Sequence, residues 1–427
     1  MKSLPANKIM PFFSITLFQL MLLLFVTSAP AYLSTNGQNS NLEMERNNII
    51  RVAAENSSAY LPFLKNKRIA LLVNQTSTVH RQHLVDFLIS NNIQVKLIFA
   101  PEHGFRGNKG AGEKISNSHD NKTGLAIISL HGKIKKPQPE QLKNIDLLVF
   151  DIQDVGVRFY TYISSLHYYM EACAENSIPL LVLDRPNPNG DYIAGPVLDL
   201  HYRSFLGMHP IPLVHGLTVG ELAQMINGEH WLKNGKQCEL KVIPVQNYTH
   251  NSHYQLPIKP SPNLPNDDAI RLYPSLALFE ATSVSVGRGS NYPFEVLAYP
   301  DATMGTFSFT PKKISGSWSR LNYAGKKLYG EKLKAADYYY FSPEPFIHWF
   351  EKFKSRKLPF ITRPEFLDKL MGTDQFRKQL SEGLNQKTIV DSWVSALKKY
   401  QQKRRHYLLY PDSDYIKEHF NQSGSQQ

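Results

Sequence analysis

The sequence predicts an α/β protein in which a largely parallel β-sheet is covered by helices on both faces. Short apolar segments alternate with segments of helical periodicity over the first half of the chain, which is the pattern of β-α units. The apolar segments are continuous rather than alternating, as is typical of strands buried on both faces. The chain has 427 residues, of which 42% are hydrophobic, so two domains are expected.

The expected elements follow in chain order. Apolar runs predict strands at 68–73, 94–99, 126–130, 145–150, 179–183 and 239–245. Helical periodicity predicts helices at 80–91 and 160–176. Thr218 and Glu221 form a capping box that begins a third helix, which runs to about residue 231. Each of these helices lies between two strands, as a parallel sheet requires.

The pattern changes after residue 255. Residues 256–266 contain four prolines, which is typical of an extended crossover or a domain linker. Beyond them we expect a strand at 307–309 and helices at 364–370 and 388–400, the second with an apolar stripe that faces the core. We therefore expect one domain at 60–255 and a second at 256–427.

The N-terminus resembles a secretory signal peptide. Lys2 and Lys8 precede an apolar segment at 10–26, and residues 29–31 (Ala-Pro-Ala) offer a cleavage site. An uncleaved anchor helix is the alternative, but the segment is short and interrupted by polar residues. We therefore expect a signal peptide at 1–31, a polar leader at 32–59 and an exported protein, periplasmic or secreted, without stable membrane insertion after cleavage.

The formal net charge is +12, and it is +10 without residues 1–31, because 46 basic and 36 acidic residues remain. A basic, solvated surface explains this charge, and attraction to an anionic polymer is the alternative. No basic run is interleaved with aromatic residues in a known module, so we expect no nucleic-acid partner. The sequence does not indicate the oligomeric state.

Metal and cofactor signals are weak. Cys173 and Cys238 lie in apolar contexts and are expected to be buried free thiols, although an exported protein could pair them. No His/Cys/Asp set has the spacing of metal ligands. Glycines follow one another at 104, 107, 110 and 112, but no phosphate-binding motif accompanies them. We therefore expect neither a metal nor a cofactor.

Polar residues gather where the predicted strands end. They are Asn74 with Gln75, Glu102 with His103, Asp151 with Asp154, and Asp184 with Arg185. Each such residue alone often caps a helix, but the carboxyl ends of parallel strands meet at one edge of a sheet, where ligands bind. The pattern therefore favours a polar cleft.

Glu102 is the leading candidate for a general acid. Pro101 stiffens the backbone before it, and a glutamate in a partly apolar pocket can donate a proton. An ion pair of Glu102 with Arg106 or with a nearby lysine is the structural alternative. His103 is either the catalytic neighbour of Glu102 or a structural hydrogen-bonding residue. Asp151 and Asp154 point to different faces if their segment is extended, so one of them enters the cleft.

A second cluster of candidate residues lies in the C-terminal half. Arg288 stands between Gly287 and Gly289, and Glu295 follows. A glycine-rich turn with a solvated arginine is the structural alternative.

Several strings of the chain resemble the NamZ family of exo-β-N-acetylmuramidases. They are residues 101–107 (Pro-Glu-His-Gly-Phe-Arg-Gly), 150–162, 183–190, 207–212, 286–289 (Val-Gly-Arg-Gly) and 407–412. The resemblance extends from about residue 60 to 412. It implies a Rossmann-like parallel-sheet N-terminal domain, a smaller C-terminal α/β domain and a cleft between them. It also implies release of N-acetylmuramic acid from the non-reducing ends of peptidoglycan fragments, without a nucleotide.

The mechanism that this resemblance suggests assigns Glu102 as general acid, with His103 beside it. The second group is left open between Asp151, Asp184, Glu295 and the 2-acetamido group of the substrate, and so is the choice between retention and inversion. The lactyl carboxylate of muramic acid needs a cation, for which arginine is well suited. The candidate substrate-binding residues are Asn74, Arg106, Asp154, Arg158, Asp184, Arg185, Arg288 and Glu295.

Two other function classes stay open at this point. A non-catalytic envelope protein could use the same cleft to bind a muropeptide without cleaving it. A peptidoglycan amidase or deacetylase is a weaker alternative, because such enzymes usually show metal-ligand spacing.

Overall fold

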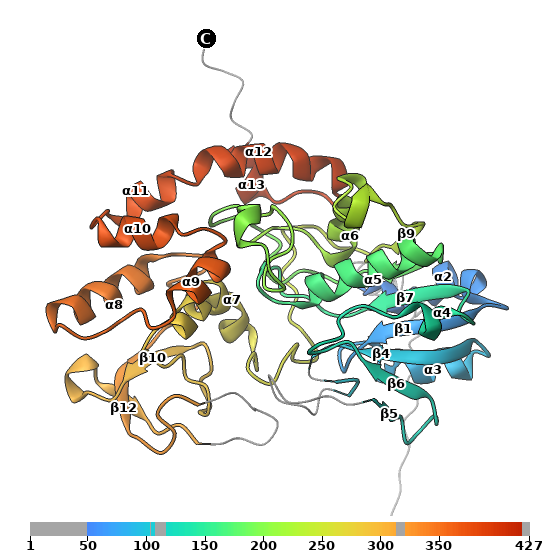
Figure 1. The fold of residues 1–427 in the computed structure, drawn as a ribbon, viewed down its shortest axis with the longest axis horizontal. Helices are drawn as coiled ribbons and strands as arrows, with labels where there is room; N and C mark the ends of the chain where they lie inside the picture. The colour runs from blue at the N-terminus through green and yellow to red at the C-terminus, as the bar shows by residue number, and fades with distance from the viewer. Residues whose placement is uncertain (1–48, 103, 107–116, 313–320, 421–427) are drawn as a thin grey trace, which may run out of the picture. The chain divides into compact units, whose positions relative to one another are not determined.

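The computed structural model describes residues 49–102, 104–106, 117–312 and 321–420 (Figure 1). The predicted signal peptide, most of the polar leader, His103 and the glycines at 107, 110 and 112 lie outside these ranges. Export therefore stays a prediction. The described residues all belong to one compact unit, and the predicted domain boundary at residue 255 likewise stays a prediction.

A seven-stranded sheet organises the first half of the described chain. The strands are β1 (Arg68–Val73), β4 (Gln94–Ala100), β5 (Ser118–His119), β6 (Ala126–Ser129), β7 (Leu147–Asp151), β8 (Leu180–Leu183) and β9 (Leu240–Ile243). Their order is β5-β6-β4-β1-β7-β8-β9, and all pairs are parallel except β5 with β6. Without β5, this is the strand order of doubly wound dinucleotide-binding folds. The predicted parallel sheet is therefore confirmed.

Helices cover both faces of this sheet (Figure 1). They are α2 (Ser57–Leu64), α3 (Leu84–Ser90), α4 (Pro139–Leu142), α5 (Tyr162–Asn176) and α6 (Val219–Gly228). Alternate residues of β1 enter different cores, because successive side chains of a strand point to opposite faces. Ile69 and Leu71 join the core that contains α2 and α3. Ala70 and Leu72 join the larger core that contains α5 and α6.

Local signals in the sequence explain where two helices begin. Thr218 and Glu221 make the predicted capping box at the start of α6. Helix α3 is shorter than predicted, because its expected first turn forms a small antiparallel hairpin of β2 (Thr78–Val79) and β3 (Gln82–His83). His80 has a φ of 52° in this hairpin, which is incompatible with a helix.

The second half of the described chain has a small antiparallel sheet with helices around it (Figure 1). Its strands are β10 (Val296–Tyr299), β11 (Phe307–Phe309) and β12 (Leu328–Lys332), in the order β10-β12-β11. The helices are α7 (Asp267–Leu276), α8 (Glu344–Ser355), α9 (Pro364–Met371), α10 (Gln375–Ser381), α11 (Gln386–Asp391), α12 (Val394–Arg404) and α13 (Asp414–Phe420). Short 3₁₀ helices are η1 (Ala53–Glu55), η2 (Leu200–Tyr202), η3 (Lys233–Gly235), η4 (Ala277–Ala281), η5 (Ala302–Met304) and η6 (Arg405–Tyr407).

The single helix predicted at 388–400 is wrong, because two helices, α11 and α12, occupy these residues. Ile389, Trp393 and Leu397 of the predicted stripe are buried, whereas Val394, the first residue of α12, is exposed. Cys173 and Cys238 are buried free thiols, as predicted. Burial raises the pKa of the Cys238 thiol to about 12.

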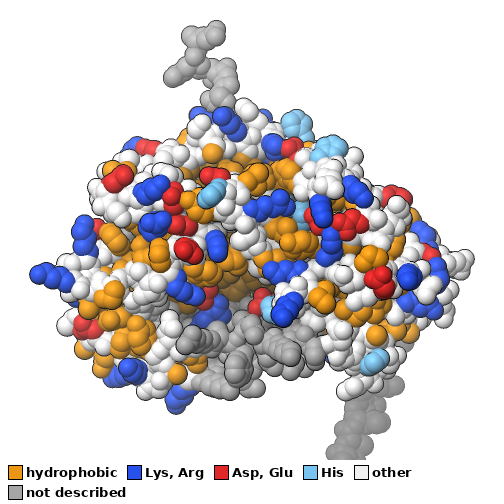
Figure 2. All heavy atoms as spheres, viewed as in Figure 1, with side chains coloured by type: hydrophobic (Ala, Val, Ile, Leu, Met, Phe, Trp, Pro, Cys, Tyr) orange, Lys and Arg blue, Asp and Glu red, His pale blue; other side chains and the backbone are white. Residues whose placement is uncertain are grey.

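The basic charge is spread over the surface. Figure 2 shows Lys and Arg side chains scattered across one face of the molecule, with Asp and Glu between them. This distribution favours the interpretation of the charge as a solvated surface. No helix in the described ranges is long and apolar enough to span a membrane.

Candidate active site

Glu102 lies in the wall of a cavity of about 150 Å³. Strand β4 ends at Ala100, Pro101 follows, and Glu102 is half-buried just past the carboxyl end of the sheet. The other described wall residues come from the segment after β7, from the proline-rich segment and from the second half of the chain. They are Phe159, Tyr160, Thr161, Tyr162, Leu206, Ser261, Asn263, Leu264, Tyr273, Arg288 and Phe294. The proline-rich segment at 256–266, predicted as an extended crossover or a domain linker, thus forms part of this wall.

Five of the twelve described residues that line the cavity are aromatic. Tyr160 packs edge-on against Tyr162, with ring centroids 5.0 Å apart, and Tyr273 packs edge-on against Phe294 at 4.9 Å. Phe159 also contacts Tyr273 edge-on, at 5.4 Å. An aromatic wall with a few polar groups is typical of small-ligand sites, and here the polar groups include a carboxyl group and a guanidinium.

The tyrosines of the wall are hydrogen-bond donors at neutral pH. Burial raises the pKa values of Tyr160, Tyr162 and Tyr273, and the charge of Glu102 raises them further. Glu102 and these three tyrosines line the same cavity. The Tyr162 hydroxyl donates to the backbone carbonyl of Glu102 at 3.4 Å, which helps to hold the loop after β4.

Arg288 carries the positive charge in this wall. Its Nε donates to Oε1 of Glu280 at 2.5 Å, and its guanidinium lies over the ring of Phe294, 4.9 Å from the centroid. Burial opposes the charged guanidinium, but Glu280 outweighs burial and raises the pKa of Arg288. Gly287 has a φ of 81°, and a Cβ there would lie 2.2 Å from the carbonyl oxygen of Tyr292. The glycine is therefore needed for the turn that presents Arg288.

A larger cavity, of about 570 Å³, adjoins the first one at Arg288. Its described wall contains Glu280, Thr282, Val284, Ser285, Val286, Arg288, Leu321, Asn322, Thr362, Arg363 and Phe366. Arg288 and Arg363 are the basic residues of this wall and Glu280 is the acidic one, so the described wall carries a net charge of about +1 at neutral pH. Arg288 is common to the walls of both cavities.

Asp151 and Arg185 form a buried ion pair behind the sheet edge. Arg185 donates from Nε to Oδ1 of Asp151 at 2.5 Å and from Nη2 to Oδ2 at 2.9 Å. Burial raises the pKa of Asp151, while the guanidinium of Arg185 opposes this rise. Neither side chain lines the cavity at Glu102. Their geometry is that of a structural fork between the ends of β7 and β8.

Asn74 and Asp154 are buried and do not line the cavity at Glu102. Oδ1 of Asn74 accepts from the backbone N and hydroxyl of Thr76, at 2.9 and 2.6 Å. Oδ2 of Asp154 accepts from the Gly156 backbone at 2.7 Å. The charge of Asp154 contributes to the raised pKa values of all three wall tyrosines, so Asp154 lies near the cavity without lining it.

Arg106 and Arg158 are engaged elsewhere. Arg106 makes two bonds to Oδ1 of Asp120, at 3.1 and 3.0 Å, and one to Oδ2 at 2.9 Å. Arg158 is fully buried and donates to the carbonyls of Pro196, Ile211 and Leu370, at 2.8, 2.8 and 2.9 Å. Burial lowers the pKa of Arg158 to about 9. Asp120 therefore binds the guanidinium of Arg106, which the structural alternative had paired with Glu102.

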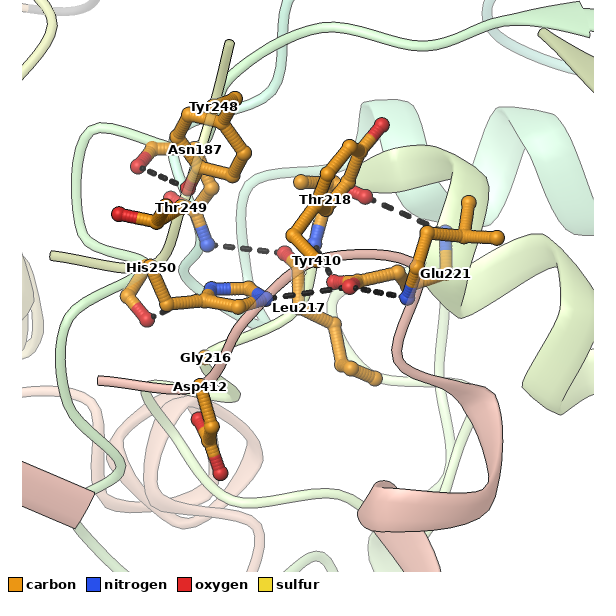
Figure 3. A network of polar contacts seen from close by, with 12 residues as sticks. Asn187, Gly216, Leu217, Thr218, Glu221, Tyr248, Thr249, His250, Tyr410 and Asp412 are labelled. Atoms are coloured by element: carbon orange, nitrogen blue, oxygen red, sulfur yellow. Dashed lines mark hydrogen bonds and ion pairs between the residues drawn. The ribbon is translucent and has the colours of Figure 1, made fainter. Parts of the chain in front are cut away.

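Asp184 belongs to a buried polar network that joins the sheet to the end of the chain. It accepts hydrogen bonds from the hydroxyls of Thr218 and Tyr410, at 2.7 and 2.5 Å. Figure 3 shows Glu221 facing His250, and their side chains are 3.1 Å apart. The backbone N of Leu409 also donates to Glu221. Asp184 therefore has a structural environment away from the cavity.

Glu295 is also occupied by its neighbours. The Asn266 amide donates to its Oε1 at 2.9 Å, and Lys332 lies 3.3 Å from its Oε2. Of the predicted residues within the described ranges, Glu102 and Arg288 are thus the two that line one cavity. His103 lies outside those ranges.

Other residues of the site did not stand out in the sequence. Tyr160 and Tyr162 lie inside a string that resembles the NamZ family, so that string could have identified them. Glu280 and Tyr273 carry no local motif, because they reach the site only through the packing of α7 and η4 (Ala277–Ala281). Phe294 has a φ of 59°, a conformation that is rare for aromatic residues and is often found at functional sites.

The fold and the site define an α/β enzyme with a carboxyl group, a guanidinium and aromatic rings around one cavity, features that suit a glycosidase. Two sequence models of the exo-β-N-acetylmuramidase NamZ match the chain, the N-terminal one over residues 69–268 and the C-terminal one over 271–410. The chain belongs to the NamZ family and is a glycosidase of this type.

Comparisons with individual proteins are consistent with membership of this family. The chain is 37% identical over 379 residues to the peptidoglycan β-N-acetylmuramidase NamZ of Bacillus subtilis (strain 168), covering 82% of this chain and 89% of the relative. Two crystal structures of DUF1343 family proteins from Bacteroides fragilis NCTC 9343 have a similar fold. One shares 43% identity with a TM-score of 0.78 and covers 86% of this chain and all of its own. The other shares 29% identity with a TM-score of 0.74 and covers 84% of this chain and 99% of its own.

Proposed function

We propose that the protein removes N-acetylmuramic acid from the non-reducing ends of peptidoglycan fragments, with Glu102 as the general acid. The position of Glu102, half-buried in an aromatic-lined cavity at the carboxyl end of β4, carries this proposal. Membership of the NamZ family supports the reaction, because the related Bacillus subtilis protein is a peptidoglycan β-N-acetylmuramidase.

In the proposed first step, the Glu102 carboxyl group protonates the glycosidic oxygen while the bond from this oxygen to the anomeric carbon breaks. Tyr162 holds the Glu102 backbone during this step, through the bond to its carbonyl. Water then adds to the sugar, and the Glu102 carboxylate takes up its proton. Glu102 is thereby restored to the acid form for the next turnover.

The group that attacks the anomeric carbon is the second element of the mechanism. Among the described residues that line this cavity, Glu102 is the only carboxylate. Asp151, Asp184 and Glu295 are each held by other partners. These contacts favour the substrate's own 2-acetamido group, whose carbonyl oxygen can attack the anomeric carbon to form a cyclic oxazolinium ion that water then opens.

The direct test is the variant Glu102→Gln on a disaccharide in which N-acetylmuramic acid is β-linked to N-acetylglucosamine, because a sugar alcohol is a poor leaving group unless its oxygen is protonated. We expect kcat to fall by about 10²–10⁴-fold, the usual contribution of a general acid, while the thermal unfolding midpoint changes little. Glu140→Gln, at an exposed site on α4, is the control and should keep wild-type turnover. Normal turnover in Glu102→Gln would remove Glu102 from the mechanism.

The same assay separates the remaining alternatives. Proton NMR of the first-formed sugar should show the β-anomer if the acetamido group takes part, since two inversions give net retention. The α-anomer would rule out acetamido participation. A muropeptide-binding protein without activity would release no sugar from the wild type, and an amidase or deacetylase would release peptide or acetate.

A further inference from the structure

The sequence suggested four arginines as candidate substrate-binding residues. In the described structure, three of them bind other groups of the protein. Arg106 pairs with Asp120, Arg185 pairs with Asp151, and Arg158 donates to three backbone carbonyls. Each of these guanidiniums is thus held by the protein itself. Arg288 is the candidate that lines the cavity at Glu102.

Arg288 keeps part of its hydrogen-bonding capacity for a ligand. Its Nε bonds to Glu280, but its Nη1 is buried and has no hydrogen-bond partner within the described parts of the chain. A buried donor without a partner costs about 1–3 kcal/mol, so such donors are rare unless a ligand or water uses them. The free side of this guanidinium therefore fits an anionic acceptor.

The surroundings fix this guanidinium in place. Glu280 holds it on one side, the ring of Phe294 supports its face, and Gly287 and Gly289 both have a φ of 81° in the turn that carries it. A preorganised fork binds a carboxylate with two parallel hydrogen bonds more strongly than a mobile side chain does.

The position of Arg288 matches the chemistry of the proposed sugar. N-acetylmuramic acid differs from N-acetylglucosamine only by the lactyl ether, which carries a carboxylate. A sugar whose glycosidic oxygen faces Glu102 would meet Arg288 in the same wall. The adjoining cavity of about 570 Å³ leaves room beyond the guanidinium, and Arg363 adds a second positive charge there.

We propose that Arg288 binds the lactyl carboxylate and thereby makes the enzyme prefer muramic acid to N-acetylglucosamine, with Glu280 as the positioning residue. This inference rests on the proposed function, because it assigns the selectivity of the same site. Glu280 acts through Arg288: it fixes the orientation of the fork and leaves the other side of the guanidinium to the substrate.

The test compares 4-nitrophenyl β-glycosides of N-acetylmuramic acid and N-acetylglucosamine. The measured quantity is the ratio of their kcat/KM values. Losing a charged hydrogen-bond pair should lower this ratio by about 10- to 100-fold in Arg288→Gln. Arg288→Lys keeps the charge without the fork and should give an intermediate ratio. Glu280→Gln should lower the ratio mainly through a higher KM for the muramic-acid glycoside.

Controls separate this inference from the proposed function. Arg203→Gln changes an exposed arginine outside both cavities and should leave the ratio unchanged. A wild type that releases muramic acid, with an unchanged ratio in Arg288→Gln, would overturn the inference alone. A wild type that releases neither sugar would overturn the proposed function. Calorimetric binding of the two free sugars then tests the inference, and equal affinity for both would overturn it as well.

Discussion

Arg158 provides the sharpest test of structural against substrate-binding roles. It is fully buried, with side-chain bonds of 2.8, 2.8 and 2.9 Å to the carbonyls of Pro196, Ile211 and Leu370. Leu370 lies in α9, so the guanidinium links the two halves of the described chain. Replacement by Met keeps the length of the side chain and removes all three donors.

The expected cost follows from these contacts. The carbonyls of Pro196 and Leu370 lose the Arg158 donors, whereas the carbonyl of Ile211 keeps the bond from the backbone N of Leu198. Hydrogen bonds to a charged group contribute about 1.5–3 kcal/mol each, so we expect a total cost of about 3–5 kcal/mol. In a protein of this size, 1 kcal/mol lowers the unfolding midpoint by about 2 °C, so Arg158→Met should unfold roughly 6–10 °C below the wild type. Differential scanning calorimetry measures this midpoint directly.

A matched control and a kinetic measurement complete the experiment. Arg203→Met changes an exposed arginine without an ion pair in the described structure, and it should alter stability by no more than about 0.5 kcal/mol. The folded fraction of Arg158→Met should keep a KM close to that of the wild type. Unchanged stability together with a raised KM would refute the structural role and return Arg158 to the substrate-binding residues.

Two further predictions concern a buried carboxyl group and a glycine. Burial raises the pKa of Asp184 from 3.8 to about 6, so the folded protein binds a proton between these pH values that the unfolded chain does not. Relative to Asp184→Asn, the free energy of unfolding of the wild type should rise by up to about 3 kcal/mol as the pH falls from 6 to 4. Urea unfolding measures this difference, and a difference that does not depend on pH would contradict the prediction. Gly287→Ala should lower the free energy of unfolding by about 3 kcal/mol and should lower activity, because the added Cβ would clash with the carbonyl oxygen of Tyr292. Gly235→Ala, with φ 67° and open space around it, should cost only about 1 kcal/mol, and equal thermal shifts for the two would contradict the clash.

The parallel sheet could be predicted from the sequence because its signals are local. Apolar runs such as 68–73 are buried on both faces whatever their neighbours are, so periodicity alone identifies them. The capping box at Thr218 is equally local and marks the start of α6 correctly. The hairpin at 78–83 escaped prediction, because its positive φ at His80 carries no sequence pattern.

The candidate site was predicted less completely, because it depends on partners that are distant in the chain. Glu102 could be identified from its place after an apolar strand. The sequence cannot show that Arg106 pairs with Asp120 rather than with Glu102, or that Asp151 pairs with Arg185. Burial and hydrogen-bond partners decide which of the polar residues that follow the strands line the cavity. Both are properties of the folded chain.

The polar network around Asp184 also determines when the protein can finish folding. The hydroxyl of Tyr410 reaches Asp184 across 226 positions of sequence, and the backbone N of Leu409 reaches Glu221 across 188. Contacts of such long range form slowly, because the intervening chain must first be brought together. The central sheet is therefore synthesised early, but its buried acids gain their last partners only when the end of the chain arrives. The last contacts at this edge of the molecule therefore form only after the last residues of the chain have been synthesised.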